Sequence, residues 1–122
     1  MTPQIVLITG ALFGLFAVVL GAFGAHALKK IATEEQIKSF ETGVKYQMYH
    51  ALVLLFAGSY FETPGLVLYY AFTVGTFLFS FSIYGLVLSS ATGKKMKFLG
   101  PVTPLGGLLL IVGWISLLLE FL

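Results

Sequence analysis

The sequence predicts an all-α membrane protein: an antiparallel bundle of four transmembrane helices, with an amphipathic helical segment between helices one and two. Of the 122 residues, 58% are hydrophobic and only 10% are charged, whereas soluble domains average about 25% charged residues. The mean hydropathy is +0.98. The apolar residues also gather in separate runs, and the connections between these runs are short enough to make consecutive helices antiparallel. A water-soluble globule is therefore excluded.

Four segments are predicted to cross the bilayer within a single domain, residues 1–122. Residues 3–28 and 66–90 carry no charge, and as helices each is longer than a hydrocarbon core of about 30 Å. Residues 102–120 form the last span. Residues 46–61 form the shortest span, which contains His50 and is extended by the flanking aromatic residues and by snorkelling of Lys45. No Lys or Arg precedes the first run, so we expect a span there and not a cleaved signal peptide.

The lysines predict how the chain is oriented. All seven lie in two of the three connections, at residues 29–45 and 94–97, and none lies near the termini or in residues 62–65. Short cytoplasmic loops retain positive charge. We therefore expect a multi-pass protein of the bacterial cytoplasmic membrane, with both lysine loops in the cytoplasm and both termini outside. The lysine loops are also expected to attract anionic lipid headgroups.

Residues 33–45 form the only sizeable polar segment. Thr33 and Gln36 have the spacing of a capping box, which predicts a helix start. Apolar residues then recur at spacings of three and four, and Glu41 and Lys45 form a favourable i,i+4 pair. Two arrangements satisfy this pattern. The segment lies flat in the membrane interface, or it continues into helix two with Gly43 as the expected bend.

Small residues predict where the helices approach each other closely, because helix association in lipid depends on backbone packing. Helix one carries them at spacings of three and four, and helices three and four carry further examples. Two interpretations stay open, packing inside one bundle and an interface between copies in a homo-oligomer. The predicted packing glycines are Gly10, Gly14, Gly21, Gly24, Gly75, Gly85, Gly106 and Gly107.

Composition excludes several classes of function. Cysteine is absent, which excludes disulfides, thiol catalysis and cysteine-ligated zinc. Seven lysines without any arginine do not form a nucleic-acid surface. No serine has an identifiable base and oxyanion hole beside it. We therefore expect no enzyme, no cofactor and no nucleic-acid partner.

Polar side chains at membrane depth are the candidate functional residues, because hydrocarbon makes them costly. His26 and His50 stand close to lysines in sequence, so we expect both just inside the cytoplasmic boundary, where they could meet. Such a pair can hold a metal ion, relay protons or fix helix register. A metal would need Glu41 or water as a further ligand, and we expect none. The remaining candidates in the inner half are Tyr46, Ser80, Ser82, Tyr84 and Thr103.

Four stretches carry a family resemblance. They are GAFGAHAL (residues 21–28), FETGVKYQMYHAL (40–52), FSFSIY (79–84) and LGPVTPLGG (99–107), followed by Gly113 and Trp114. In this order they resemble the small bacterial membrane family of the YgdD and YwdK type, which also has a mammalian relative. The resemblance implies a four-helix protein of the bacterial cytoplasmic membrane without an established activity. Its marked residues correspond to His26, Glu41, Tyr46, His50, Ser80, Ser82, Tyr84, Thr103, Pro104, Gly106 and Gly107.

These observations support two hypotheses about function. The first is a non-enzymatic, self-associating accessory protein that binds a lipid headgroup or a partner helix through an inner-half polar cluster and the lysine loops. The alternative is a small transporter or channel for protons, ions or a small solute. The alternative is weakened because no carboxylate lies deep in any span, Glu120 being at the outer end.

Overall fold

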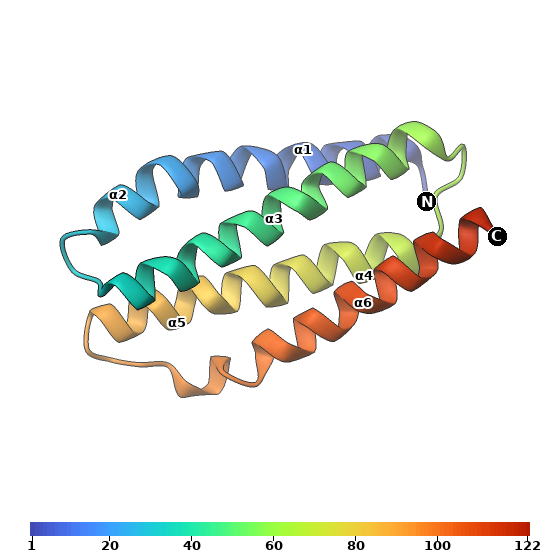
Figure 1. Cartoon of the computed structure of the whole chain (residues 1–122). Coiled ribbons are helices and arrows are strands. Elements are labelled where there is room, and N and C mark those ends of the chain that lie inside the picture. The colour runs from blue at the N-terminus through green and yellow to red at the C-terminus, as the bar shows by residue number, and fades with distance from the viewer.

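The computed structural model describes all 122 residues and contains helices only (Figure 1). The first helical rod consists of α1 (Pro3–Val19), the π-helical turn η1 (Leu20–Gly24) and α2 (Ala25–Leu28). The second is α3 (Glu34–Tyr60). The third consists of α4 (Leu66–Thr76), the π-helical turn η2 (Phe77–Phe81) and α5 (Ser82–Ala91). The fourth is the short 3-10 turn η3 (Lys97–Leu99) followed by α6 (Val102–Phe121).

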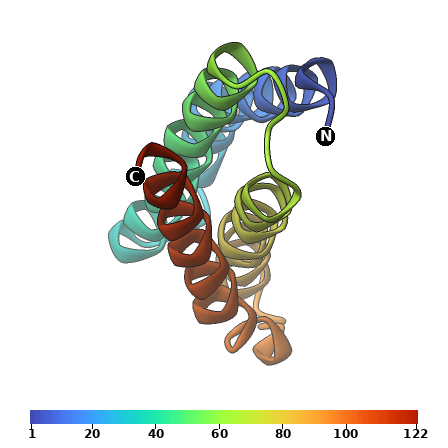
Figure 2. The ribbon, with the colours of Figure 1, turned by 90° about the vertical axis from the view of Figure 1, so that its right-hand side faces the viewer.

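Consecutive rods run in opposite directions, so both termini lie at one end of the molecule and the two lysine-bearing connections lie at the other (Figure 1). We call these the terminal end and the lysine end. Viewed from the terminal end, α1 and α3 form one pair, and α4–α5 and α6 form a second pair beside it (Figure 2). The chain is therefore an all-helical protein of four rods.

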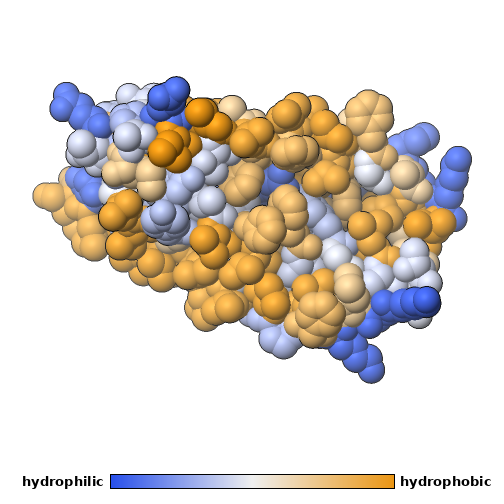
Figure 3. All heavy atoms as spheres, turned by 180° about the vertical axis from the view of Figure 1, so that it is seen from behind, coloured by the Kyte–Doolittle hydropathy of each residue, from blue (hydrophilic) through white to orange (hydrophobic).

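Three of the rods are long and apolar enough to cross a membrane: Pro3–Leu28, Leu66–Ala91 and Lys97–Phe121. The rod formed by α3 is slightly longer, at 27 residues, but lysines, glutamates, Gln47 and His50 interrupt its apolar residues. Seen from behind, hydrophobic residues cover most of the middle of the molecule, and hydrophilic residues gather at both ends (Figure 3). This distribution suits a protein that is surrounded by lipid over its middle.

Of the two arrangements predicted for residues 33–45, the structure has the second: these residues continue into helix two as part of α3. The predicted capping box is confirmed. The Gln36 amide donates to Thr33 Oγ1 at 3.1 Å, and the Thr33 amide donates to Gln36 Oε1 at 2.9 Å. The prediction of a bend at Gly43 is wrong, since α3 passes through it as regular α-helix. Gly43 is buried, and a Cβ there would lie only 2.8 Å from the Tyr84 ring.

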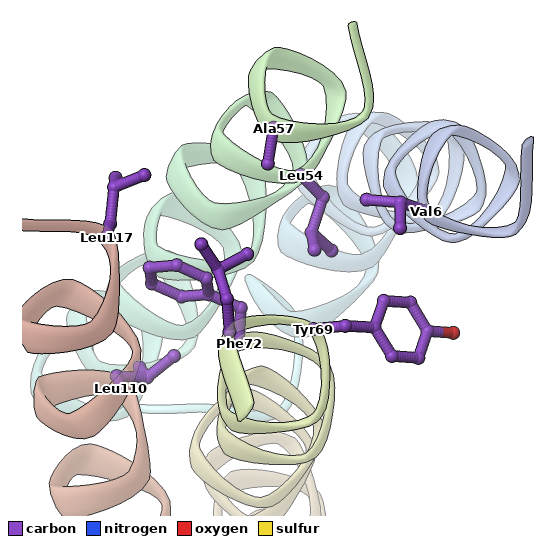
Figure 4. Packing of buried hydrophobic residues seen from close by; sticks show 8 residues of the cluster. Val6, Leu54, Ala57, Tyr69, Phe72, Leu110 and Leu117 are labelled. Atoms are coloured by element: carbon purple, nitrogen blue, oxygen red, sulfur yellow. The ribbon is translucent and has the colours of Figure 1, made fainter. Parts of the chain in front are cut away.

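The terminal half of the bundle has a close-packed apolar core. Side chains from α1, α3, α4 and α6 point toward one another there, with Phe72 and Leu54 fully buried at the centre (Figure 4). A smaller core lies at the lysine end around Phe40 and Tyr84, whose ring centroids are 5.0 Å apart. The α3 helix contributes to both cores, so it joins the two halves of the bundle.

The predicted packing glycines face neighbouring helices of the same chain. On α1, a Cβ at Gly10 would lie 2.9 Å from the carbonyl oxygen of Ala51 on α3. Further along the rod, Gly14, Gly21 and Gly24 face Ala51, Val44 and Phe40 of α3, respectively. In the second pair, Gly75 faces the α6 backbone and Gly106 faces the η2 backbone, whereas Gly85 and Gly107 approach the side chains of Leu99 and Phe79. These contacts favour packing inside one bundle as the role of the glycines.

The two π-helical turns are not foreseen by the sequence patterns. They lie in the first and third rods, at the same level along α3. Gly21 and Gly24 of η1 approach Val44 and Phe40, and Ser80 of η2 donates a 2.7 Å hydrogen bond to the carbonyl oxygen of Gly43. Such turns are rare and occur often near functional sites.

Candidate functional site

Gln47 forms side-chain hydrogen bonds to two other helices. It is fully buried on α3. Its Nε2 donates to the carbonyl oxygen of Phe13 on α1 at 2.8 Å, and its Oε1 accepts from the Tyr84 hydroxyl of α5 at 2.7 Å. One amide therefore ties three helices together. Gln47 is not among the predicted site residues, although an uncharged amide one turn before His50 in an apolar segment is an available signal.

His50 uses both of its ring nitrogens within the protein. The Trp114 indole N–H donates to Nε2 at 3.1 Å, and Nδ1 lies 2.7 Å from the carbonyl oxygen of Tyr46. An indole nitrogen can only donate, so Nε2 is the acceptor and Nδ1 carries the hydrogen that Tyr46 accepts. Both nitrogens are occupied, and neither is available to a metal ion. Of the three roles considered for histidine, this geometry favours the fixing of helix register.

His26 and His50 do not meet, and the expectation that they could is wrong. His50 lies next to Ala51, which faces Gly14, whereas His26 lies on α2, 12 residues beyond Gly14. At 1.5 Å per residue the two levels are about 18 Å apart. The error came from taking Lys45 as the inner boundary of helix two, because α3 begins 11 residues earlier, at Glu34.

The other predicted site residues divide into buried and exposed groups. Ser82 is buried, and its hydroxyl lies 2.5 Å from that of Thr103, which joins α5 to α6. His26 and Glu41 are exposed, and neither side chain forms a hydrogen bond to another helix. The Tyr46 ring packs against Phe79 of η2, with centroids 4.7 Å apart. No group of three or more His, Cys, Asp or Glu side chains is placed to hold a metal ion.

A groove between α3 and α6 begins at the lysine end. Its first part, which we call the polar cavity, has a volume of about 800 Å³ and has α5 as its floor. Hydroxyl groups come from three different elements around it, and two lysines of the α5–α6 connection stand at its rim. The polar residues that line it are Thr33, Glu35, Gln36, Ser39, Thr42, Ser90, Lys95, Lys97 and Thr103.

The groove continues toward the middle of the bundle as an apolar cavity of about 560 Å³. Pro104 lines both cavities, so they lie next to each other. The hydrogen bond between His50 and Trp114 crosses the far end of the apolar cavity. Its other lining residues are Tyr46, Phe79, Gly107, Leu108, Leu110 and Ile111.

A second polar feature runs inside the bundle along α4–α5. The Tyr69 hydroxyl lies 2.8 Å from that of Thr9 on α1, and Ser80 bonds to α3 as described above. Between them Thr73 and Thr76 follow at spacings of four and three residues, on the same face. Their buried hydroxyls have no hydrogen-bond partner. Buried polar groups without a partner are rare and call for an explanation.

The chain is similar to known membrane proteins. The family described as "Protein of unknown function (DUF423)" matches residues 20–107. A UPF0382 membrane protein of Staphylococcus aureus (strain bovine RF122 / ET3-1) is 39% identical over 119 residues, which are 95% of this chain and 93% of the relative. A UPF0382 membrane protein of Schizosaccharomyces pombe is 36% identical over 88% of this chain and 93% of the relative. No solved structure matches the chain.

Proposed function

The chain belongs to the DUF423 family, whose relatives are membrane proteins, and from this premise we propose that it is a non-enzymatic accessory protein that binds anionic lipid in the bacterial cytoplasmic membrane. The polar cavity is the observation that carries the proposal. Lys95 and Lys97 oppose a single carboxylate, Glu35, so the lining has a net charge of +1. The Ser39 hydroxyl lines the same cavity as a hydrogen-bond donor, whereas the Thr42 hydroxyl donates to the carbonyl oxygen of Lys38. Phosphate is the group that such a lining suits.

The proposal includes four spans, with α3 as the fourth. α3 packs along most of the first rod, and the 27 residues of α3 and the 26 of that rod give lengths of about 40 Å. The polar residues of α3 gather toward the lysine end, where they would lie in the membrane–water interface. The YgdD and YwdK type expected from the motifs would then be this same four-span family. Its two lysine connections lie in the cytoplasm and its termini outside.

Cysteine labelling tests this topology, because the chain has no native cysteine. Single variants Lys38→Cys, Lys95→Cys and Thr63→Cys are treated with a membrane-impermeant maleimide on intact cells and on inside-out vesicles. We expect the first two to react only in the vesicles and the third only in intact cells. Reaction of Lys38→Cys and Lys95→Cys on opposite sides would refute the four-span arrangement.

Native mass spectrometry from nanodiscs of mixed anionic and neutral lipid tests the binding. We expect the parent to retain anionic lipid, and the double variant Lys95→Gln/Lys97→Gln to lose that preference. The matched control is Lys29→Gln/Lys30→Gln, which removes the same charge at the same end but outside the cavity. Equal retention of neutral and anionic lipid by the parent would refute the proposal, and so would an equal loss in both double variants.

Self-association is also part of the proposal. The glycines of α1 are occupied by α3, so copies would meet through the exposed apolar side chains of the outer faces. The spectra from nanodiscs also give the stoichiometry. Dimers or larger assemblies are expected, and monomers at every protein concentration would contradict this part.

One observation favours the alternative, a small transporter or channel. The unpartnered hydroxyls of Thr73 and Thr76 lie between the Thr9–Tyr69 pair and the Gln47–Tyr84 pair, and such groups can hydrogen-bond to water molecules that relay protons. Proton flux into liposomes that contain the parent or Thr76→Val tests this candidate. A flux that the parent supports and the variant abolishes would favour it, whereas equal flux in both, or none in either, would exclude this path.

A further inference from the structure

We infer that the apolar cavity between α3 and α6 holds an acyl chain of the bound lipid, so that the protein binds a whole anionic glycerophospholipid by headgroup and chain together. This inference rests on the proposed function and deepens it. It names the ligand class and assigns the second half of the groove, which headgroup binding alone leaves without a role.

Along the groove, the side chains of α3 change from polar to apolar, in the same order as the parts of a lipid from its headgroup to its acyl chains. Glu35, Ser39, Thr42, Tyr46 and His50 follow at spacings of four, three, four and four residues, which places them on one face of the helix. The first three line the polar cavity and the last two line the apolar cavity. Charged and hydroxyl groups therefore stand at the lysine end, and aromatic and aliphatic groups stand deeper in the bundle.

The length of the apolar cavity matches the depth of one leaflet. Along α6 its lining runs from Pro104 to Trp114, which is about 15 Å at 1.5 Å per residue. The hydrocarbon core is about 30 Å thick, so one leaflet is about 15 Å deep. A chain that enters beside the lysines would reach the His50–Trp114 pair near the middle of the membrane, where that hydrogen bond crosses the groove.

A helix does not fit wholly inside the apolar cavity. A helix segment 15 Å long and 10 Å across occupies about 1,200 Å³, roughly twice the volume of about 560 Å³ that the cavity offers. The contacts are also those that a methylene chain needs. The Phe79 ring forms the floor, and Gly107 leaves the α6 wall open, because a Cβ there would meet only that ring, at 3.8 Å.

The variant Gly107→Leu tests the inference by placing four carbon atoms in the apolar cavity. The matched control is Val112→Phe, which adds four carbon atoms to an exposed position of α6 outside the cavity. Each protein is purified from nanodiscs that contain phosphatidylglycerol, and the retained lipid is counted by native mass spectrometry. Glycerol phosphate, which carries a similar phosphate without acyl chains, is the second probe.

We expect Gly107→Leu to lower retention of phosphatidylglycerol about tenfold or more, because it displaces several buried methylene groups of the chain. Val112→Phe should retain as much lipid as the parent, and glycerol phosphate should not be retained. Full retention by Gly107→Leu would overturn the inference and leave headgroup binding intact. Retention of glycerol phosphate as strong as that of the lipid would overturn it in the same way. If the parent protein retained neutral and anionic lipid equally, the proposed function itself would be refuted.

Photocross-linking keeps the inference testable if Gly107→Leu does not fold. Phosphatidylglycerol with a photoreactive group at the end of one acyl chain is added to the parent protein, and the labelled residues are mapped. Labelling should concentrate on residues 46–50 and 107–114. Labelling spread evenly over the exposed faces of α1 and α6 would overturn the inference, as would a second copy of the chain cross-linked in the groove.

Discussion

Replacing Gly106 by alanine should destabilise the bundle, whereas the same change at the next residue should not. The Cβ of Gly106→Ala would lie 2.8 Å from the Cα atom of Phe79 and 2.9 Å from the carbonyl oxygen of Gly75. Both are backbone atoms, so no side-chain rotation relieves the contact. α6 must then move away from α4 and η2. Overpacking of this kind costs about 1–3 kcal/mol, which lowers the folding equilibrium constant by a factor of roughly 5 to 150.

Gly107→Ala is the internal control, because its Cβ would meet only the Phe79 ring, at 3.8 Å. That is an ordinary van der Waals contact. Alanine also has a higher helix propensity than glycine, by about 1 kcal/mol. The free energy of unfolding of Gly107→Ala should therefore be equal to that of the parent or slightly higher.

Reversible unfolding in mixed micelles, with an increasing fraction of a denaturing detergent, measures both variants. The chain has a single tryptophan, Trp114, so its fluorescence reports the environment of α6 directly. Gly106→Ala should unfold at a lower fraction of denaturing detergent than the parent. If Gly106→Ala proved as stable as Gly107→Ala, the close approach of α6 to η2 would be refuted.

Three further changes have definite expected outcomes in the same assay. Gln47→Leu should lower the free energy of unfolding by about 1–3 kcal/mol, because it leaves the buried Tyr84 hydroxyl without its acceptor; a stability equal to the parent's would argue against that bond. Thr33→Ala removes a capping side chain and should cost about 1 kcal/mol, with faster amide hydrogen exchange in the first turn of α3; unchanged exchange there would contradict the cap. Gly85→Ala should cost less than Gly106→Ala, since its Cβ would meet the tip of Leu99, a side chain that can rotate away; a cost as large as that of Gly106→Ala would show that Leu99 is held in place.

Local signals predicted the helices well. The ends of the first rod coincide with the predicted residues 3–28, because Pro3 suits the first turn of a helix and Lys29 ends the apolar run. The capping box at Thr33 was readable because it depends on residues three apart in sequence. The position of α3 relative to the lysines was not readable in the same way. Lys45 was taken as a boundary, although a lysine can stand on the side of a helix that continues past it.

The candidate site was predicted only in part. Ser82 and Thr103 were expected in one inner cluster, and they do meet, whereas His26 lies far from His50. The amide of Gln47 in an apolar segment was a readable signal, but its bonds to α1 and α5 were not, because no pattern within α3 reveals its partners. The groove between α3 and α6 was also missed. It arises where two helices diverge, which depends on the crossing of helices and not on the sequence of either one.

The shared level of the two π-helical turns has a mechanical consequence. At residues 40–44 of α3, the first and third rods have π-helical turns, whereas α3 and α6 pass that level as regular α-helix. Departures from regular α-helical hydrogen bonding are where helices flex. Deformation of the molecule, by membrane thinning or by lateral pressure, would concentrate in this plane. The first and third rods would bend there, and α3 and α6 would hold the lysine end to the terminal end.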